Sequence, residues 1–235
     1  KTRITCLVHV IVNTHLNTAR ANKTYKWSGS DNQSNWNNNY KSHSSFLDTL
    51  EDFTYTYNKD GFRTHEFDSN PCVIALGCSH TEGVGVAEHQ TWPAKLEQKL
   101  QKTVYNLGVG GTGIDTCYRL MKYYAIKLNA DAVCLNIPPE RFEIYTGKFW
   151  ETYTVQNIDR VDFMKQWFTN EANTVLHQDK LINAIHWFCS TNNLKLATTL
   201  WDDKEYLADD IGRDLLHNGP KYHENISTGM HKQLQ

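Results

Sequence analysis

Short apolar runs alternate with predicted helices over most of the chain. Four runs have the length and apolar character of buried strands: 72–76, 104–107, 132–137 and 194–200. Four longer segments are predicted helices, two of them with apolar residues at clear helical spacing: 88–102, 114–128, 174–189 and 220–234. Strands that alternate with helices predict a parallel sheet with right-handed crossovers, which is the α/β class.

The first part of the chain follows a different pattern. Residues 28–45 are rich in Asn, Ser and Gly, a composition that buries little surface and predicts a loop or a disordered arm. We expect Trp27, Trp36 and Tyr40 to anchor this arm over an edge of the core. Residues 53–57 alternate between aromatic and polar side chains and predict a strand.

An aromatic segment follows the third predicted strand. Residues 138–173 have no clear strand pattern but are unusually rich in Phe, Tyr and Trp. Two interpretations remain: a lid or stacking platform for an aromatic or sugar substrate, and a local aromatic core between small helices. The second is favoured, because buried aromatic residues outnumber binding platforms.

Length and charge narrow the class of protein. The 235 residues fit one α/β domain, residues 71–235, preceded by an N-terminal extension, residues 1–70. A formal net charge of −2 argues against an electrostatic nucleic-acid partner. No apolar stretch is long enough to span a bilayer, so a soluble protein is expected.

The cysteines and the start of the chain bear on its compartment. None of the six cysteines forms a Cys-x-x-Cys pair, which favours buried reduced thiols over a disulfide framework. Residues 4–12 are apolar and are followed by small residues, as in a short signal peptide, but His9 interrupts the run. A cytoplasmic location is therefore favoured over secretion, and the compartment stays open.

Candidate chemistry lies at the end of the first core strand and near the end of the chain. Ser79 follows the run 72–76 through Gly77, at the strand edge where open α/β folds bind their ligands. Asp214 and His217 are three residues apart, so that one turn can bring the carboxylate to the imidazole. A serine nucleophile needs this base and this orienting group. Each residue taken singly also fits a structural role, such as a helix cap for Ser79.

Three sequence blocks give the chain a resemblance to the SGNH, or GDSL-type, hydrolase superfamily. They are Gly77-Cys78-Ser79 with Trp92-Pro93 after it, Asn106-Leu107-Gly108-Val109-Gly110-Gly111, and Asp214-Leu215-Leu216-His217 before Gly219-Pro220. The resemblance covers residues 72–235. It implies a three-layer α/β/α sandwich with a mostly parallel, flavodoxin-like sheet, to which the N-terminal extension is added.

The resemblance also implies roles for individual residues. Ser79 would be the nucleophile, His217 the base and Asp214 its orienting carboxylate. The backbone N–H groups of Ser79 and Gly111 would form the oxyanion hole. His80 and Trp201 are candidates for contact with the substrate.

Two positions depart from the family pattern. Cys78 replaces the usual aspartate before the serine, and the third block, Gly-x-Asn-Asp after the third strand, is missing. Either Arg141, Asn136 or neither replaces the side-chain oxyanion donor of that block. No His-x-x-x-His or His-Glu-x-x-His pair is present, so neither a catalytic metal nor another cofactor is expected.

These observations predict a serine esterase that works through an acyl-serine intermediate. Its expected substrates are short acyl or O-acetyl esters, on a small molecule or a carbohydrate. Two alternatives keep the fold: a catalytically weak carbohydrate-binding or structural module, and an O-acetyltransferase with the same triad. The sequence leaves the natural substrate and the oligomeric state open.

Overall fold

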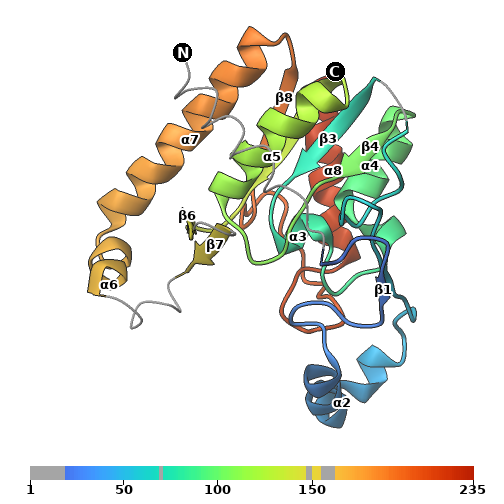
Figure 1. Ribbon diagram of the computed structural model, residues 1–235. Helices are drawn as coiled ribbons and strands as arrows, with labels where there is room; N and C mark the ends of the chain where they lie inside the picture. Colours follow the sequence, from blue (N-terminus) through green and yellow to red (C-terminus); the bar gives the residue numbers. More distant parts are fainter. Residues whose placement is uncertain (1–18, 69–70, 147–149, 155–161) are drawn as a thin grey trace.

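A parallel four-stranded sheet forms the centre of the protein (Figure 1). The computed structural model describes residues 19–68, 71–146, 150–154 and 162–235. The sheet order is β4-β3-β5-β8, and each neighbouring pair is parallel. Its strands are β3 (Cys72–Leu76), β4 (Val104–Asn106), β5 (Ala130–Ile137) and β8 (Lys195–Leu200). The predicted α/β class with a flavodoxin-like strand order is confirmed.

Helices cover both faces of the sheet, which gives three layers. On one face, α5 (Ile114–Lys127) and α7 (Glu171–Thr191) share a buried apolar cluster with the strands. On the other face, α4 (Trp92–Leu100) and α8 (Pro220–Leu234) share a second cluster. A sheet that is buried on both faces explains why β3 is apolar at every position.

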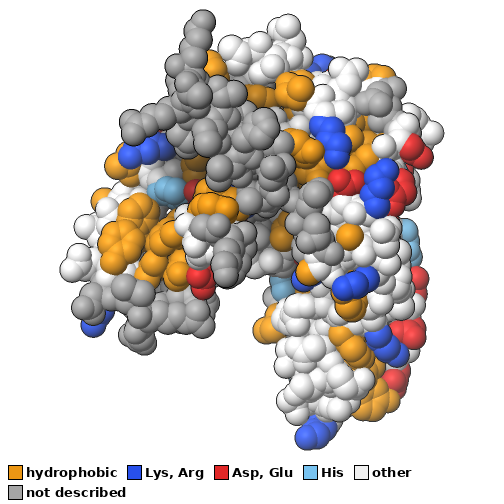
Figure 2. Space-filling model, in the orientation of Figure 1, with side chains coloured by type: hydrophobic (Ala, Val, Ile, Leu, Met, Phe, Trp, Pro, Cys, Tyr) orange, Lys and Arg blue, Asp and Glu red, His pale blue; other side chains and the backbone are white. Residues whose placement is uncertain are grey.

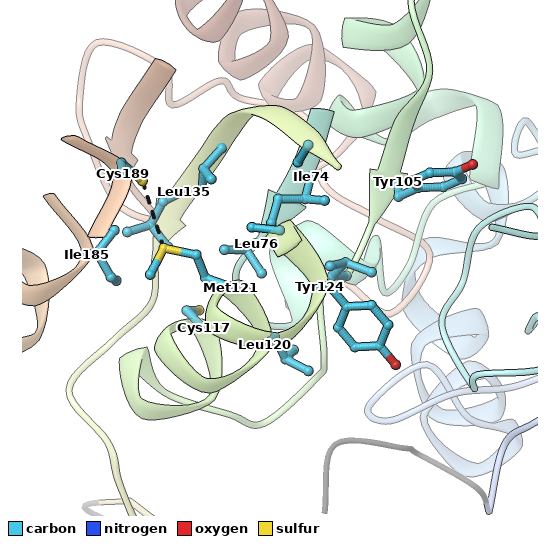
Figure 3. Packing of buried hydrophobic residues seen from close by; sticks show 14 of the residues in the cluster. Ile74, Leu76, Tyr105, Cys117, Leu120, Met121, Tyr124, Leu135, Ile185 and Cys189 are labelled. Carbon is cyan, nitrogen blue, oxygen red and sulfur yellow. Dashed lines mark hydrogen bonds between the residues drawn. The ribbon is translucent and has the colours of Figure 1, made fainter. Parts of the chain in front are cut away.

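The α5 face shows how the helical periodicity becomes packing. Met121 points from α5 toward Leu135 of the sheet, and Leu120 and Leu76 belong to the same buried cluster (Figure 3). Cys189 of α7 lies with its Sγ 3.9 Å from the Sδ of Met121. This contact joins the two helices of the layer through soft sulfur atoms inside an apolar cluster.

The helix predicted over residues 88–102 is divided in the structure. A 3-10 turn, η1 (Glu88–Gln90), precedes α4, and Thr91 between them has extended backbone angles. The Thr91 hydroxyl accepts a hydrogen bond from Ala94 N, and Pro93 lies in the first turn of α4. A threonine N-cap followed by a proline in the first turn marks the start of a helix. The prediction of a single helix over residues 88–102 was therefore wrong.

The aromatic segment forms a hairpin and a short helix. Strands β6 (Phe142–Tyr145) and β7 (Trp150–Tyr153) pair antiparallel, and α6 (Asp162–Phe168) follows. Phe142 is buried and its ring packs on the rings of Tyr153, Trp167 and Phe168. These contacts agree with a local aromatic core. Figure 2 shows the surface hollowed between the lobe of α6 with this hairpin and the lobe of α2.

The Asn- and Ser-rich region is a helix rather than the predicted loop. Helix α2 (Gln33–Leu47) begins after Asn32, whose side chain accepts a hydrogen bond from Asn35 N, and it buries Leu47. Trp27 packs on Trp36 and on the guanidinium of Arg213, so this aromatic anchor of the extension touches the domain. An N-cap and tertiary packing here outweigh a polar composition with weak helix propensity.

The extension contains two short strands, and the described cysteines are buried thiols. Strands β1 (Thr24–Tyr25) and β2 (Tyr55–Thr56) pair antiparallel, so the strand predicted over residues 53–57 is reduced to two residues. The five cysteines in the described part of the chain are free and buried. Cys6 and the signal-like residues 4–12 lie outside the described residues. None of the described helices is long and apolar enough to cross a membrane.

Candidate active site

Ser79 lies at the carboxyl edge of the sheet, at the start of a one-turn helix. Helix α3 (Ser79–Glu82) follows β3 directly (Figure 1) and ends at Gly83, whose backbone is left-handed (φ 82°). The turn between strand and helix is tight, because a Cβ on Gly77 would lie 2.1 Å from Thr81 Oγ1 and 2.9 Å from the Asn136 carbonyl oxygen. The chain leaves β3 for β4 on one side and later returns to β5 on the other. Ser79 therefore stands at the switch point where such folds bind ligands.

Asp214 and His217 lie on a turn just before α8. Asp214 Oδ1 accepts hydrogen bonds from the backbone N–H groups of Leu216 and His217, at 3.2 and 3.1 Å. Leu215 between them has a left-handed backbone (φ 54°), which costs a non-glycine residue roughly 1 kcal/mol or more. The surrounding hydrogen bonds hold this conformation, and it turns the imidazole of His217 back toward its own carboxylate.

The structure brings Ser79, His217 and Asp214 into one hydrogen-bonded chain. His217 Nδ1 lies 2.6 Å from Asp214 Oδ2, and its Nε2 lies 2.8 Å from Ser79 Oγ. Because an ionised carboxylate only accepts, Nδ1 carries the proton and Nε2 is free to accept one from Ser79. This arrangement can activate a serine hydroxyl as a nucleophile.

Asp214 is fully buried and ionised. Burial raises the pKa of its carboxyl, but the hydrogen bond and charge of His217, together with the hydroxyl of Ser30, lower the pKa to about 2. The charge is thus available at neutral pH to hold the imidazole in one tautomer.

Sequence reasoning missed Ser30, a residue of the N-terminal extension. Its Oγ donates a hydrogen bond of 2.6 Å to Asp214 Oδ2 and lies 3.4 Å from His217 Nδ1. The contact spans 184 residues of chain. No local pattern signals such a contact, because it depends on how the extension folds over the turn.

Glu82 is a second residue that the sequence did not single out. Its carboxylate is buried and accepts from Arg20 and from the Tyr57 hydroxyl, each at 2.6 Å. Its other oxygen accepts from the backbone N–H of Gly110, also at 2.6 Å. Glu82 therefore ties the extension and the glycine loop after β4 to the helix that begins with Ser79.

The candidate oxyanion residues have different surroundings. Gly111 has a left-handed backbone (φ 79°), and a Cβ placed on it would meet no atom within 4 Å, so it faces open space. One guanidinium nitrogen of Arg141 donates to the Thr112 carbonyl, beside Gly111. Asn136 is buried in β5 and donates its amide to the Tyr222 hydroxyl of α8.

His80 lies beside the imidazole of His217. The two rings are 4.8 Å apart, and Trp201 packs on His80 at 5.5 Å. Burial, with contributions from His217 and from the charge of Arg141, lowers the pKa of His80 to about 3. His80 is neutral and mostly buried (9% exposed), and its ring lies against the rings of His217 and Trp201. Trp201 is the more exposed of the two predicted contact residues.

No protein-family model matches the sequence, and no curated protein matches it. Among solved structures, the chain is similar to TesA, with TM-score 0.48 and 9% identity over 70% of this chain and 98% of that chain. It is similar to the esterase EstA from Pseudoalteromonas sp., with TM-score 0.45 and 11% identity over 70% and 97%. A member of the lipolytic protein G-D-S-L family from Veillonella parvula gives TM-score 0.35 and 9% identity over 67% and 94%.

Proposed function

We propose that this protein is a serine esterase that cleaves carboxylic esters through an acyl-serine intermediate. One observation carries the proposal. A hydroxyl, an imidazole and a buried carboxylate are joined at 2.8 and 2.6 Å at the ligand-binding edge of the sheet. As predicted from the sequence, Ser79 is the proposed nucleophile, His217 the base and Asp214 the orienting group.

In the acylation step, Ser79 Oγ attacks the ester carbonyl carbon while its proton passes to His217 Nε2. The new Oγ–C bond pushes the carbonyl electron pair onto oxygen and gives a tetrahedral anion. When this anion collapses, the bond to the alcohol breaks, and the alcohol oxygen takes the proton from Nε2. Water then repeats the sequence on the acyl-serine and releases the acid.

The tetrahedral oxyanion needs donors that are already in place. We infer that the N–H groups of Ser79 and Gly111 supply them. Ser79 is the first residue of α3, where an N–H group has no intrahelical acceptor. The neighbouring Gly110 N–H is bound to Glu82, which orients the loop and leaves Gly111 against open space.

Of the two side-chain candidates for the missing third block, the surroundings favour Arg141. The amide of Asn136 is engaged by Tyr222 inside the protein. The positive charge of Arg141 acts on His80 beside the triad, and its bond to Thr112 uses only one of five N–H donors. A cationic donor would stabilise the developing oxyanion of an ester.

For the substrate, we propose a short acyl or O-acetyl ester, on a small molecule or a carbohydrate. Trp201 lies against His80, and Leu216 of the catalytic turn is 70% exposed, so apolar and aromatic groups flank the triad.

The experiment that tests this function compares wild type with Ser79→Ala on p-nitrophenyl acetate and butyrate. We expect turnover by the wild type and a loss of at least about 10³-fold in kcat for the variant, because the nucleophile is removed. A serine-directed phosphonate should label the wild type and not the variant. Equal activity in both proteins would contradict the esterase.

The missing third block favours one second candidate, a binding module with weak catalysis. It predicts little turnover by either protein and no phosphonate adduct on Ser79. An acetyltransferase with the same triad would instead transfer acetyl to an added sugar faster than to water. Product analysis in the same assay separates the three outcomes.

A further inference from the structure

A hydroxyl from the N-terminal extension completes the hydrogen bonding of the catalytic carboxylate. Asp214 Oδ1 is occupied by two backbone N–H groups, and Oδ2 by the imidazole of His217 and by Ser30 Oγ. A carboxylate has about four lone-pair sites, so these four donors saturate it. Ser30 is the one member of the set that does not come from the Asp214–His217 turn.

The segment around Ser30 is built to hold this hydroxyl in place. Ser28 and Asp31 bond each other through their backbones at 2.9 and 3.1 Å, which closes a tight turn at Ser30. The side-chain amides of Asn32 and Asn35 both donate to the Ser30 carbonyl. The backbone at Ser30 is therefore fixed on both sides.

A buried ion pair locks this turn to the catalytic turn. Arg213, the neighbour of Asp214, contacts both carboxylate oxygens of Asp31, the neighbour of Ser30, at 2.6–3.1 Å. Both side chains are at most 2% exposed. The guanidinium also packs over the rings of Phe53 and Trp27. Two adjacent pairs thus align: Asp31 with Arg213, and Ser30 with Asp214.

We propose that Ser30 is a positioning residue of the catalytic site, acting on His217 through the Asp214 carboxylate. This inference rests on the proposed esterase function for its kinetic consequences. It makes the N-terminal extension a component of the site. The hydroxyl orients Oδ2. Its hydrogen bond also disperses part of the negative charge of the carboxylate that the imidazole faces.

Loss of the Ser30 donor changes the negative charge that the His217 ring faces. Without the Ser30 donor, the carboxylate concentrates its charge on His217 and holds the protonated imidazole more strongly. The other titratable groups around the ring stay in place: His80 of α3 at 4.8 Å, His223 of α8, and Arg141, whose charge acts on His80. The acid limb of the kcat/KM profile should therefore move to higher pH.

The test compares Ser30→Ala, Ser30→Thr and the exposed control Ser34→Ala, with p-nitrophenyl acetate as substrate. For Ser30→Ala we expect kcat to fall roughly tenfold with little change in KM, because a hydrogen bond to a charged group is lost. Its acid limb should shift upward. Ser30→Thr retains the hydroxyl and should restore both values, and Ser34→Ala should match wild type.

A second measurement keeps the two proposals separate. NMR titration of the His217 ring follows the imidazole directly and needs no turnover. A shifted titration in Ser30→Ala supports the positioning role, even if wild type proves inactive and the esterase is abandoned. A Ser30→Ala protein with wild-type titration and pH profile would overturn the role of Ser30. A lower activity in which Ser30→Thr fails to rescue would overturn it as well.

Discussion

At the scale of single residues, the site depends on which groups donate hydrogen bonds to each carboxylate oxygen of Asp214. Oδ2 accepts a hydrogen bond from the Nδ1–H of His217, and this fixes Nε2 as the acceptor that faces Ser79. The sequence spacing predicted this contact, because two side chains three residues apart can share a turn. The contact with Ser30 had no such signal.

The change Asp214→Asn should separate geometry from charge at this position. An amide nitrogen in place of Oδ2 cannot accept from Nδ1–H, so the imidazole would change tautomer and Nε2 would lose its acceptor role. We expect kcat to fall roughly 10³–10⁴-fold, measured with p-nitrophenyl acetate at neutral pH. Asp209→Asn, at an exposed position, is the matched control and should keep full activity. A loss below tenfold would show that Asp214 does not orient the base.

At the scale of elements, the glycine loop after β4 crosses α3 with almost no space between their backbones. A Cβ on Gly108 would lie 2.4 Å from Glu82 N and 2.7 Å from the carbonyl carbon of Thr81. Asn106 fastens the same crossing, because its amide donates to the Thr81 carbonyl and its oxygen accepts from Gly108 N–H. The spacing of the loop relative to Ser79 therefore follows from this contact between elements.

Gly108→Ala should test the crossing. The clash is with backbone, which cannot rotate away, so we expect a loss of about 3 kcal/mol in the free energy of unfolding. In the same loop, a Cβ on Gly111 would meet no atom within 4 Å. Gly111→Ala should therefore lower the free energy of unfolding only by the strain of its left-handed backbone, about 1 kcal/mol. Urea unfolding of the two variants measures the difference. Equal losses would mean that the loop does not rest on α3 as described.

At the scale of the whole molecule, the extension and the domain share one polar network. Arg63, before β3, is buried and donates to the carbonyls of Gly83 and Val86 after α3. Tyr55 bridges Asp31 and the N–H of Gly85. Removal of the extension would take these partners from the Gly83 and Val86 carbonyls, from Gly85 N–H and from the guanidinium of Arg213. The division of the chain after residue 70 stays a prediction.

Buried histidines make the stability of the whole fold depend on pH. Burial lowers the pKa of His80 to about 3 and that of His223 well below its ordinary value of 6.5. As pH falls below 6.5, the unfolded chain binds protons that the folded protein does not. The free energy of unfolding should therefore decrease by up to about 1.4 kcal/mol per pH unit for each histidine.

His223→Asn is the variant that checks this effect. His223 Nδ1 accepts from Trp92 N–H at 3.1 Å, and an asparagine oxygen offers an acceptor in its place. We expect the slope of unfolding free energy against pH to decrease by about 1.4 kcal/mol per pH unit between the two pKa values. Urea unfolding across this pH range gives the slope. An unchanged slope would mean that His223 takes up a proton in the folded protein.

The sequence by itself determined the features that arise from local periodicity and strand order. Short apolar runs gave β3, β4, β5 and β8, and β3 is apolar at every position because it is buried on both faces. The end of the first core strand placed Ser79 at the ligand-binding edge. The resemblance of the sequence blocks, and not the strand order, joined Asp214 and His217 to it. The Thr-Trp-Pro start of α4 was also present in the sequence, although the periodicity around it hid the break.

Only the tertiary structure decided what the extension does. Ser30, Glu82 and Arg213 act through partners 25 to 184 residues away, and such contacts leave no period in the chain. The Asn- and Ser-rich composition of α2 predicted a loop, because such residues bury little surface on their own. The side chain of the N-cap Asn32, the buried Leu47 and a hydrogen bond from Asn39 to the Asp214 carbonyl hold the helix instead. One polar residue of the predicted arm, Ser30, thus becomes a donor to the carboxylate of the site.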